Sequence, residues 1–317
     1  MKVGVQVSPH EGYTWEAWFE VTRLVEDLGF DSLWVSDHLA PVYGGKDQPA
    51  IDPFLALTIA ARDTKRVRLG TIVACVLFRH PALLARMAAQ IDVLSGGRLE
   101  LGVGAGSVPA EFETFGIPFP STKERLDTLE DTVRVLRALW ATEHASYQGH
   151  TLALRDAAAY PKPAQAQLPI MVGGNGERRT LRIAAAHADH WNCMSLSLDQ
   201  FAAKGAVLDQ RCHEVGRDPA SIRRSINFAY VIGVDDGRLR EGIEGVMASN
   251  PRLGREHGAA METLRAEGWV LGTAEQVAEH LHRFAEAGAS EVMFRTTGRH
   301  DPQALELLAT KVLPRVR

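Results

Sequence analysis

An acidic residue and a histidine stand side by side at the end of an apolar run, in the segment SLWVSDHLAP (residues 32–41). Imidazole side chains in general titrate near neutral pH, and a carboxylate such as that of Asp37 can fix the tautomer of a histidine, so the pair Asp37 and His38 is suited to acid–base chemistry. The alternative is a structural pair, in which His38 bonds nearby backbone and Asp37 holds it in place. Adjacent residues of a strand point to opposite faces, so the two side chains need not touch. The strand-end position favours a functional role.

A glycine-rich turn is the second chemical feature, in VGGNGERRTL (residues 172–181). Gly173 and Gly174 end a predicted strand, and Gly176 lets the chain turn into a helix whose first N–H groups have no backbone partner. Such a turn can bind a phosphate group. The segment matches neither GK[ST] nor GxGxxG, and an ordinary tight turn between strand and helix is the alternative.

Other candidate residues are placed less favourably. The segment GVGAG (residues 102–106) either admits a flat ligand or simply relieves crowding inside a sheet. His187 and His190 flank a helix-to-strand turn at the opposite end of the sheet, where ligation of a metal is not expected. The sequence has no nucleophile elbow and no HExxH motif, so hydrolysis by those routes is unsupported. A redox cofactor that carries a phosphate fits the remaining features better.

Eight short β-branched runs must position these residues. They are residues 2–8, 32–38, 67–74, 99–106, 169–174, 190–195, 226–233 and 291–296. Amphipathic segments lie between them, and one begins with a capping box of Ser121 and Glu124. This alternation predicts an α/β fold, a (β/α)₈ TIM barrel that forms one domain over residues 1–317.

Two segments are longer than the loops of a minimal barrel require. Residues 142–168 contain short alternating pieces around Gly149 that suggest a hairpin, and residues 235–272 are polar and partly helical. We interpret both as insertions in the βα loops. Barrel enzymes build specificity in such loops, so we expect both segments to influence the choice of substrate.

The strand assignment also selects candidate ligand contacts, because the carboxyl end of every barrel strand faces the active site. These candidates are Asp37, His38, Ile72, Val73, Gly106, Ser107, Gly173, Gly174, Asn175, Gly176 and Cys193.

Composition limits the partners. The formal net charge is −4 and no basic block occurs, which argues against nucleic acid and against a membrane surface. The three cysteines form no paired motif and fit a reducing compartment. No apolar stretch approaches the roughly 20 residues that span a bilayer. We therefore expect a cytoplasmic protein that acts on a small molecule.

Several segments, in fixed order, resemble the bacterial luciferase-like family, in particular its branch that uses the deazaflavin coenzyme F420. The resemblance covers nearly the whole chain. The segments are LWVSDH (33–38), LGTIV (69–73), FRHPALLARMAAQIDVLSGGRLELGVGAG (78–106), FGIPFPSTKERLDTLEDTVRVLRALW (115–140), PIMVGGNGERRTLRIAAAHADHWN (169–192) and GTAEQVAEHLHRFAEAGASEVMFR (272–295).

The resemblance implies where a cofactor binds. It places the deazaflavin ring at the barrel mouth, backed by a non-proline cis peptide between Ile72 and Val73. It places the cofactor phosphate over residues 173–176, and His38 beside the reactive ring carbon. Asp37 stands where relatives contact the cofactor or the active-site wall.

One position departs from the sugar-phosphate dehydrogenases of this family. Ser107 follows the GVGAG segment where those enzymes have a catalytic glutamate. The departure argues against a sugar phosphate as the substrate.

We therefore expect an enzyme, a coenzyme F420-dependent oxidoreductase that moves a hydride between the deazaflavin and a small organic substrate, with His38 as its catalytic group. The first alternative is a monooxygenase of the same family that binds reduced FMN. The second is a non-catalytic flavin-binding protein. The family resemblance also implies a homodimer.

Overall fold

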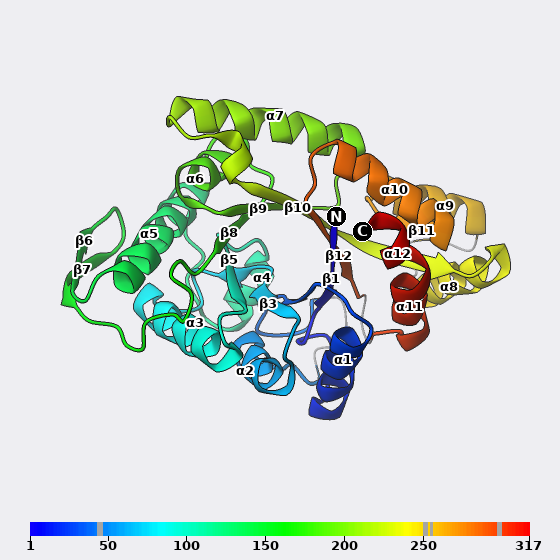
Figure 1. Cartoon of the computed structure of the whole chain (residues 1–317), viewed down its shortest axis with the longest axis horizontal. Helices are drawn as coiled ribbons and strands as arrows, with labels where there is room; N and C mark the ends of the chain where they lie inside the picture. Colours follow the sequence, from blue (N-terminus) through cyan, green and yellow to red (C-terminus); the bar gives the residue numbers. More distant parts are fainter. Residues whose placement is uncertain (43–46, 250–252, 254–255, 297–299) are drawn as a thin grey trace.

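A closed ring of eight parallel strands forms the centre of the molecule in the computed structural model, which describes residues 1–42, 47–249, 253, 256–296 and 300–317 (Figure 1). The ring closes because β10 pairs with both β9 and β12, and β12 pairs with β1. The predicted TIM barrel is confirmed. In ring order the strands are β1 (Lys2–Val7), β2 (Ser32–Val35), β3 (Arg68–Thr71), β5 (Leu99–Gly104), β8 (Ile170–Gly173), β9 (His190–Met194), β10 (Arg223–Gly233) and β12 (Glu291–Arg295).

Helices surround this ring on the outside (Figure 1). Between barrel strands lie α1 (Trp15–Asp27), α2 (Pro53–Asp63), α3 (Pro81–Ser95), α5 (Thr122–Ala141), α6 (Thr180–His187), α7 (Leu198–Glu214) and α10 (Ala274–Glu286). A 3₁₀ turn (Pro219–Ser221) leads from α7 to β10. The chain ends in α11 (Pro302–Leu307), a π-helical turn (Leu308–Val312) and α12 (Leu313–Val316).

Local sequence explains where several helices begin and end. The predicted capping box is present at the start of α5, where Ser121 and Glu124 bond each other's backbone N–H groups. Pro81 occupies the first position of α3, where its missing N–H costs nothing. Gly29 follows α1 with φ +82°, a conformation that glycine adopts without steric cost. These signals fix the lengths of the helices and so the level at which each next strand begins.

The main core lies between the outer face of the strands and the helices. A smaller apolar cluster fills the inside of the barrel and consists of Trp34, Ile72, Met171 and Met293, with Val73 packed against it. Among the described residues, no helix is both long and apolar enough to cross a membrane.

The first predicted insertion folds as a hairpin, as the sequence suggests. Strand β6 (Ala145–Gln148) pairs antiparallel with β7 (Ala153–Ala157) beside α5, far from the barrel axis (Figure 1). However, this hairpin follows α5 and precedes β8, so it lies at the amino-terminal face of the barrel. The interpretation of this segment as an insertion in a βα loop is therefore wrong.

The second predicted insertion does follow a barrel strand and so lies on the mouth side. It contains α8 (Asp236–Ser249), α9 (His257–Ala266) and a strand that the sequence did not reveal, β11 (Val270–Thr273). Strand β11 pairs with the outer half of β10, from Tyr230 to Gly233. Residues 250–252 and 254–255 of the predicted insertion lie outside the described residues. The insertion has its own small apolar cluster around Ile243 and Leu264.

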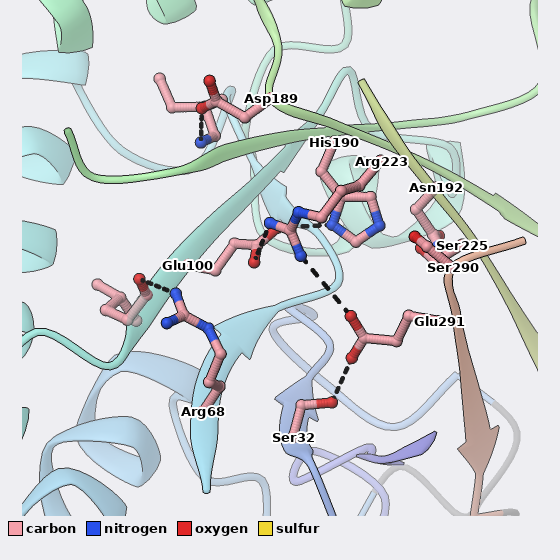
Figure 2. Close-up of polar contacts among 12 residues, drawn as sticks. Ser32, Arg68, Glu100, Asp189, His190, Asn192, Arg223, Ser225, Ser290 and Glu291 are labelled. Atoms are coloured by element: carbon pink, nitrogen blue, oxygen red, sulfur yellow. Dashed lines mark hydrogen bonds and ion pairs between the residues drawn. The ribbon is translucent and has the colours of Figure 1, made fainter. Parts of the chain in front are cut away.

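A buried network of charged groups closes the amino-terminal end of the barrel (Figure 2). The Glu100 carboxylate contacts His190 Nδ1 at 2.6 Å and accepts a hydrogen bond from Arg223 at 2.6 Å. Arg223 also lies 3.8 Å from Glu291, which accepts a hydrogen bond from Ser32. Burial alone would raise the pKa of Glu100, but His190 and Arg223 lower it to about 2. We call these five residues the base network. It contains His190, which lies at the end of the barrel opposite the active site, as the sequence analysis predicts.

Candidate active site

The carboxyl ends of the barrel strands surround a cavity of about 410 Å³, a volume typical of sites for small molecules. Of the predicted site residues, nine line it: Asp37, His38, Ile72, Val73, Gly106, Ser107, Gly173, Gly174 and Asn175. Residues from β1, β4 (Ala74–Cys75), β9, β10 and β12 complete the wall. The structure thus brings together segments that are distant in sequence, at the face where barrel enzymes carry their active sites.

His38 makes its closest polar contact with a carboxylate that the sequence analysis did not identify. Its Nδ1 lies 3.0 Å from Oε2 of Glu111, on the short helix α4 (Pro109–Thr114) after β5. The other oxygen of Glu111 accepts a hydrogen bond from the Leu39 N–H. The Glu111 side chain is 7% exposed and that of His38 is 25% exposed. His38 is therefore the more exposed member of the pair, although both residues line the cavity.

The state of Glu111 decides which nitrogen of His38 carries a proton. Burial alone would raise the pKa of Glu111, but the contact with His38 and the Leu39 N–H hold it below its ordinary value. An ionised carboxylate only accepts hydrogen bonds, so Nδ1 of His38 must be the donor. In the neutral ring, Nε2 then carries the lone pair and can accept a proton.

Asp37 links the end of β2 to β4 and, through Arg79, to the start of α2. Its Oδ2 accepts hydrogen bonds from the Cys75 N–H at 2.9 Å and from Arg79 at 2.7 Å. Arg79 also bonds Asp52, the N-cap of α2, at 2.7 Å. Burial raises the pKa of Asp37, and both Arg79 and the Cys75 N–H oppose that rise. The side chain supports the cavity wall, and Arg79 is its main partner.

A second histidine lies against the first. His10, three residues after β1, is 2% exposed and lines the same cavity. The centroids of the His10 and His38 rings are 4.6 Å apart. Nε2 of His10 lies 3.4 Å from the carboxylate of Glu11. The sequence analysis did not single out this residue, although its place after the first strand is a signal that could have found it.

The cis peptide implied by the family resemblance is present between Ile72 and Val73. The side chain of Val73 packs against glycines of the next two strands around the ring, β5 and β8. A Cβ atom at Gly104 would lie 2.5 Å from a Val73 methyl, and one at Gly173 would lie 2.6 Å from the other. Glycine is therefore required at both positions by close packing, which favours the crowding interpretation of the GVGAG segment at Gly104.

The glycine-rich turn after β8 only partly faces the cavity. Gly174, with φ +128°, and Asn175 line it, whereas Gly176 does not. A Cβ atom at Gly176 would instead lie 2.8 Å from the Thr180 hydroxyl, at the start of α6. Within the described residues, the buried Oδ1 of Asn175 has no hydrogen-bond partner.

Cys193 lies outside the cavity, on the other face of β9. Its thiol is buried in the main core, where it contacts the Ser225 carbonyl at 3.5 Å, and burial raises its pKa. Its neighbours Asn192 and Met194 line the cavity instead. Because side chains alternate between the faces of a strand, selecting the middle of these three residues selected the wrong face.

Comparisons with known proteins agree with this architecture. The model of the family described as luciferase-like monooxygenase matches residues 1–291. An F420-dependent glucose-6-phosphate dehydrogenase from Beutenbergia cavernae is 31% identical, over 93% of this chain and 92% of the relative. An F420-dependent hydroxymycolic acid dehydrogenase from Mycobacterium tuberculosis is 28% identical, over 99% of this chain and 88% of the relative.

Solved structures share the fold. An F420-dependent secondary alcohol dehydrogenase, in complex with an F420–acetone adduct, superposes with a TM-score of 0.84 at 23% identity, covering 100% of this chain and 99% of that one. The oxygenating constituent of 3,6-diketocamphane monooxygenase from Pseudomonas putida, in complex with FMN, gives a TM-score of 0.79 at 19% identity, with coverages of 100% and 99%.

Proposed function

The chain belongs to the luciferase-like monooxygenase family, and we propose that it is a coenzyme F420-dependent oxidoreductase within it. The observation that carries this proposal is the His38–Glu111 pair, which faces the cavity beside the wall formed by Val73 and its glycines. The names of the relatives support the choice of cofactor, because both curated relatives described above are F420-dependent dehydrogenases.

The cavity wall suits a flat ring with a phosphate-bearing chain. Val73 and Gly106 offer a surface of small groups. Buried amide oxygens of Asn175 and Asn227 have no partner among the described residues, so each can accept a hydrogen bond from a ligand after a small rotation. We assign the ring to this wall and the phosphate to Gly173, Gly174 and Asn175, beside Gly176.

The chain's own residues account for the proton in the reaction. When bound, the deazaflavin supplies a ring carbon that accepts or donates a hydride. For an alcohol substrate, Nε2 of His38 takes the hydroxyl proton as the hydride leaves the carbon, and the product is a carbonyl compound. Glu111 accepts the hydrogen bond from Nδ1 throughout and stabilises the positive charge that develops on the ring.

The cavity also bears on the kind of substrate. Apolar side chains of Val42, Phe78, Val108, Phe112 and Met194 line it. They support a small organic substrate with an apolar substituent next to the reacting carbon. The carboxylate that contacts His38 comes from Glu111 on α4. The sugar-phosphate dehydrogenases that the sequence resembles carry their glutamate four residues earlier, at the position of Ser107.

We further propose a homodimer in the cytoplasm. Large apolar side chains are about half exposed on the neighbouring helices α2 and α3, at Leu55, Leu83 and Leu94, which supports a contact between two copies there. The three cysteines are all unpaired and buried, which suits a reducing compartment.

A side-by-side titration tests the cofactor and the activity. Purified protein is titrated with F420 and with FMN, each oxidised and reduced, and then assayed without oxygen against a panel of secondary alcohols and ketones. We expect selective binding of F420 and F420-dependent turnover. Selective binding of reduced FMN with oxygen uptake would overturn the proposal in favour of a monooxygenase. Tight binding without turnover would overturn it in favour of a binding protein.

A further inference from the structure

His10, which lines the cavity beside His38, forms a second imidazole–carboxylate pair with Glu11 behind the cavity wall. We propose that this pair sets the pH at which His38 gains and loses its proton, so that His10 and Glu11 act as positioning residues for the proton step. The inference rests on the proposed function, because that function makes His38 the proton carrier.

Geometry places the two rings in direct contact. Their centroids are 4.6 Å apart and their planes are inclined by 57°. His10 is the more buried of the two, with a side chain 3% exposed, against 25% for His38. Glu11 is itself held in place, because its carboxylate accepts a hydrogen bond of 2.7 Å from the Val42 N–H. The second pair is therefore built into the wall.

Charge links the two rings. Each imidazole has its own carboxylate, so each has a group that favours its protonation. Two positive rings at this separation repel each other strongly in a poorly solvated site, so the two protonations are coupled. A proton on His10 therefore makes His38 easier to deprotonate, and this keeps His38 ready to accept the substrate's proton.

Other charged or titratable groups also lie around the two rings. Among the described residues that line the cavity, they are Asp37, Cys75, Glu111 and Arg295. Asp37 is neutralised by Arg79, and burial raises the pKa of Cys75 to about 12, so that thiol is uncharged. Glu111 contacts His38 directly, and a charge on His10 also acts on it. His10 with Glu11 is thus the element that can change the charge next to His38.

Replacing His10 with a neutral residue should shift the titration of His38 in a defined direction. The substitution removes a group that can take up a proton beside His38, while the carboxylate of Glu11 stays in place. Both effects favour the positive form of His38. We therefore expect the titration of His38 in His10→Phe to move to higher pH, by about one pH unit.

The experiment is an NMR titration of the full chain labelled with ¹³C in the histidine rings. The His38 signal is assigned by its loss in His38→Ala. We expect the midpoint to rise in both His10→Phe and His10→Gln, and to stay in place in Ser8→Ala, which changes a neutral group lining the same cavity. An unmoved midpoint in the His10 variants would overturn the inference. If His10→Phe does not fold, His10→Gln carries the test.

This readout does not depend on F420. The acid limb of the kcat/KM profile for F420 reduction by propan-2-ol should move in the same direction, whereas a purely structural role would lower the plateau without moving the limb. Absence of any F420-dependent turnover would contradict the proposed function, while the NMR titration would still decide the role of His10.

Discussion

The two ends of the barrel each hold a histidine bonded to a buried carboxylate, yet only the pair at the mouth lines the cavity. At the base, His190 contacts Glu100 and is completely buried. At the mouth, His38 contacts Glu111 in a similar way but is 25% exposed, beside a cavity of about 410 Å³. Both carboxylates have a lowered pKa and stay ionised at neutral pH. The histidine–carboxylate pair itself therefore does not distinguish the two ends, whereas access to a cavity does.

The base network should respond to mutation with the largest loss of stability. Glu100→Ala leaves His190 and Arg223 without their shared carboxylate in a buried site. We expect the free energy of unfolding, measured with urea, to fall by about 3–5 kcal/mol. The exposed Glu143 provides the matched control, and Glu143→Ala should change stability little. A loss at Glu100 no larger than at Glu143 would contradict a structural role for the base.

Acid should weaken the same network in a defined range. The pKa of Glu100 is about 2 in the folded protein, below its ordinary value of 4.5. A lowered folded pKa means that this contribution to stability is complete above about pH 4.5 and is lost as the pH falls towards 2. Urea unfolding between those limits should show a steeper acid dependence in the wild type than in Glu100→Ala. Parallel curves for the two proteins would remove Glu100 as the cause.

The mouth should instead respond with a loss of rate. In the proposed mechanism His38→Ala removes the atom that takes the substrate's proton, so we expect kcat for F420 reduction to fall about 100-fold. Because the side chain is partly exposed, stability should change by no more than about 1 kcal/mol. The affinity for F420, from a fluorescence titration, should stay within threefold. An unchanged kcat would remove His38 from the mechanism.

The wall of the mouth should affect binding more than rate. Gly173→Ala would place a Cβ atom 2.6 Å from a Val73 methyl and push that side chain towards the cavity. We expect the Kd for F420 to rise about tenfold, roughly 1.4 kcal/mol. Gly258→Ala on α9 is the control, since a Cβ there meets nothing within 4 Å. Equal affinities in the two variants would count against this wall as the cofactor site.

The smallest effect is expected at the hairpin on the amino-terminal face. Tyr147 in β6 donates a hydrogen bond of 2.7 Å to Asp131 in α5. Tyr147→Phe should lower stability by about 1 kcal/mol and leave kcat and the F420 affinity unchanged. A change in kcat/KM would show that the amino-terminal face influences the active site, and would contradict the prediction that the hairpin affects stability alone.

Sequence reasoning located the barrel because its signals are local. Short β-branched runs, helix caps and glycine stops mark each unit without reference to the rest of the chain. Strand β11 escaped notice because its four residues pair only with the outer half of β10, a contact that depends on the tertiary fold. The position of the hairpin before β8 could have been deduced from the order of elements alone.

The site was only half predictable for a similar reason. His38 and the glycine turn stand directly at strand ends, where the barrel rule selects them. Glu111 lies on a six-residue helix inside a loop, and no local pattern shows that this loop folds back onto β2. The prediction of Cys193 as a cavity residue was wrong because side chains alternate along β9. Its neighbours Asn192 and Met194 face the cavity instead.

A double-mutant cycle on the pair at the mouth tests the central claim most directly, namely that His38 and Glu111 act as one unit in the proton step. The rate of a single turnover of F420 with the best alcohol of the panel is measured for His38→Ala, Glu111→Gln and the double variant. Glu113→Gln, on the exposed side of the same helix, serves as the control. We predict that Glu111→Gln alone slows the reaction at least tenfold but adds no more than about twofold once His38 is gone. Losses that multiply in the double variant would contradict the claim.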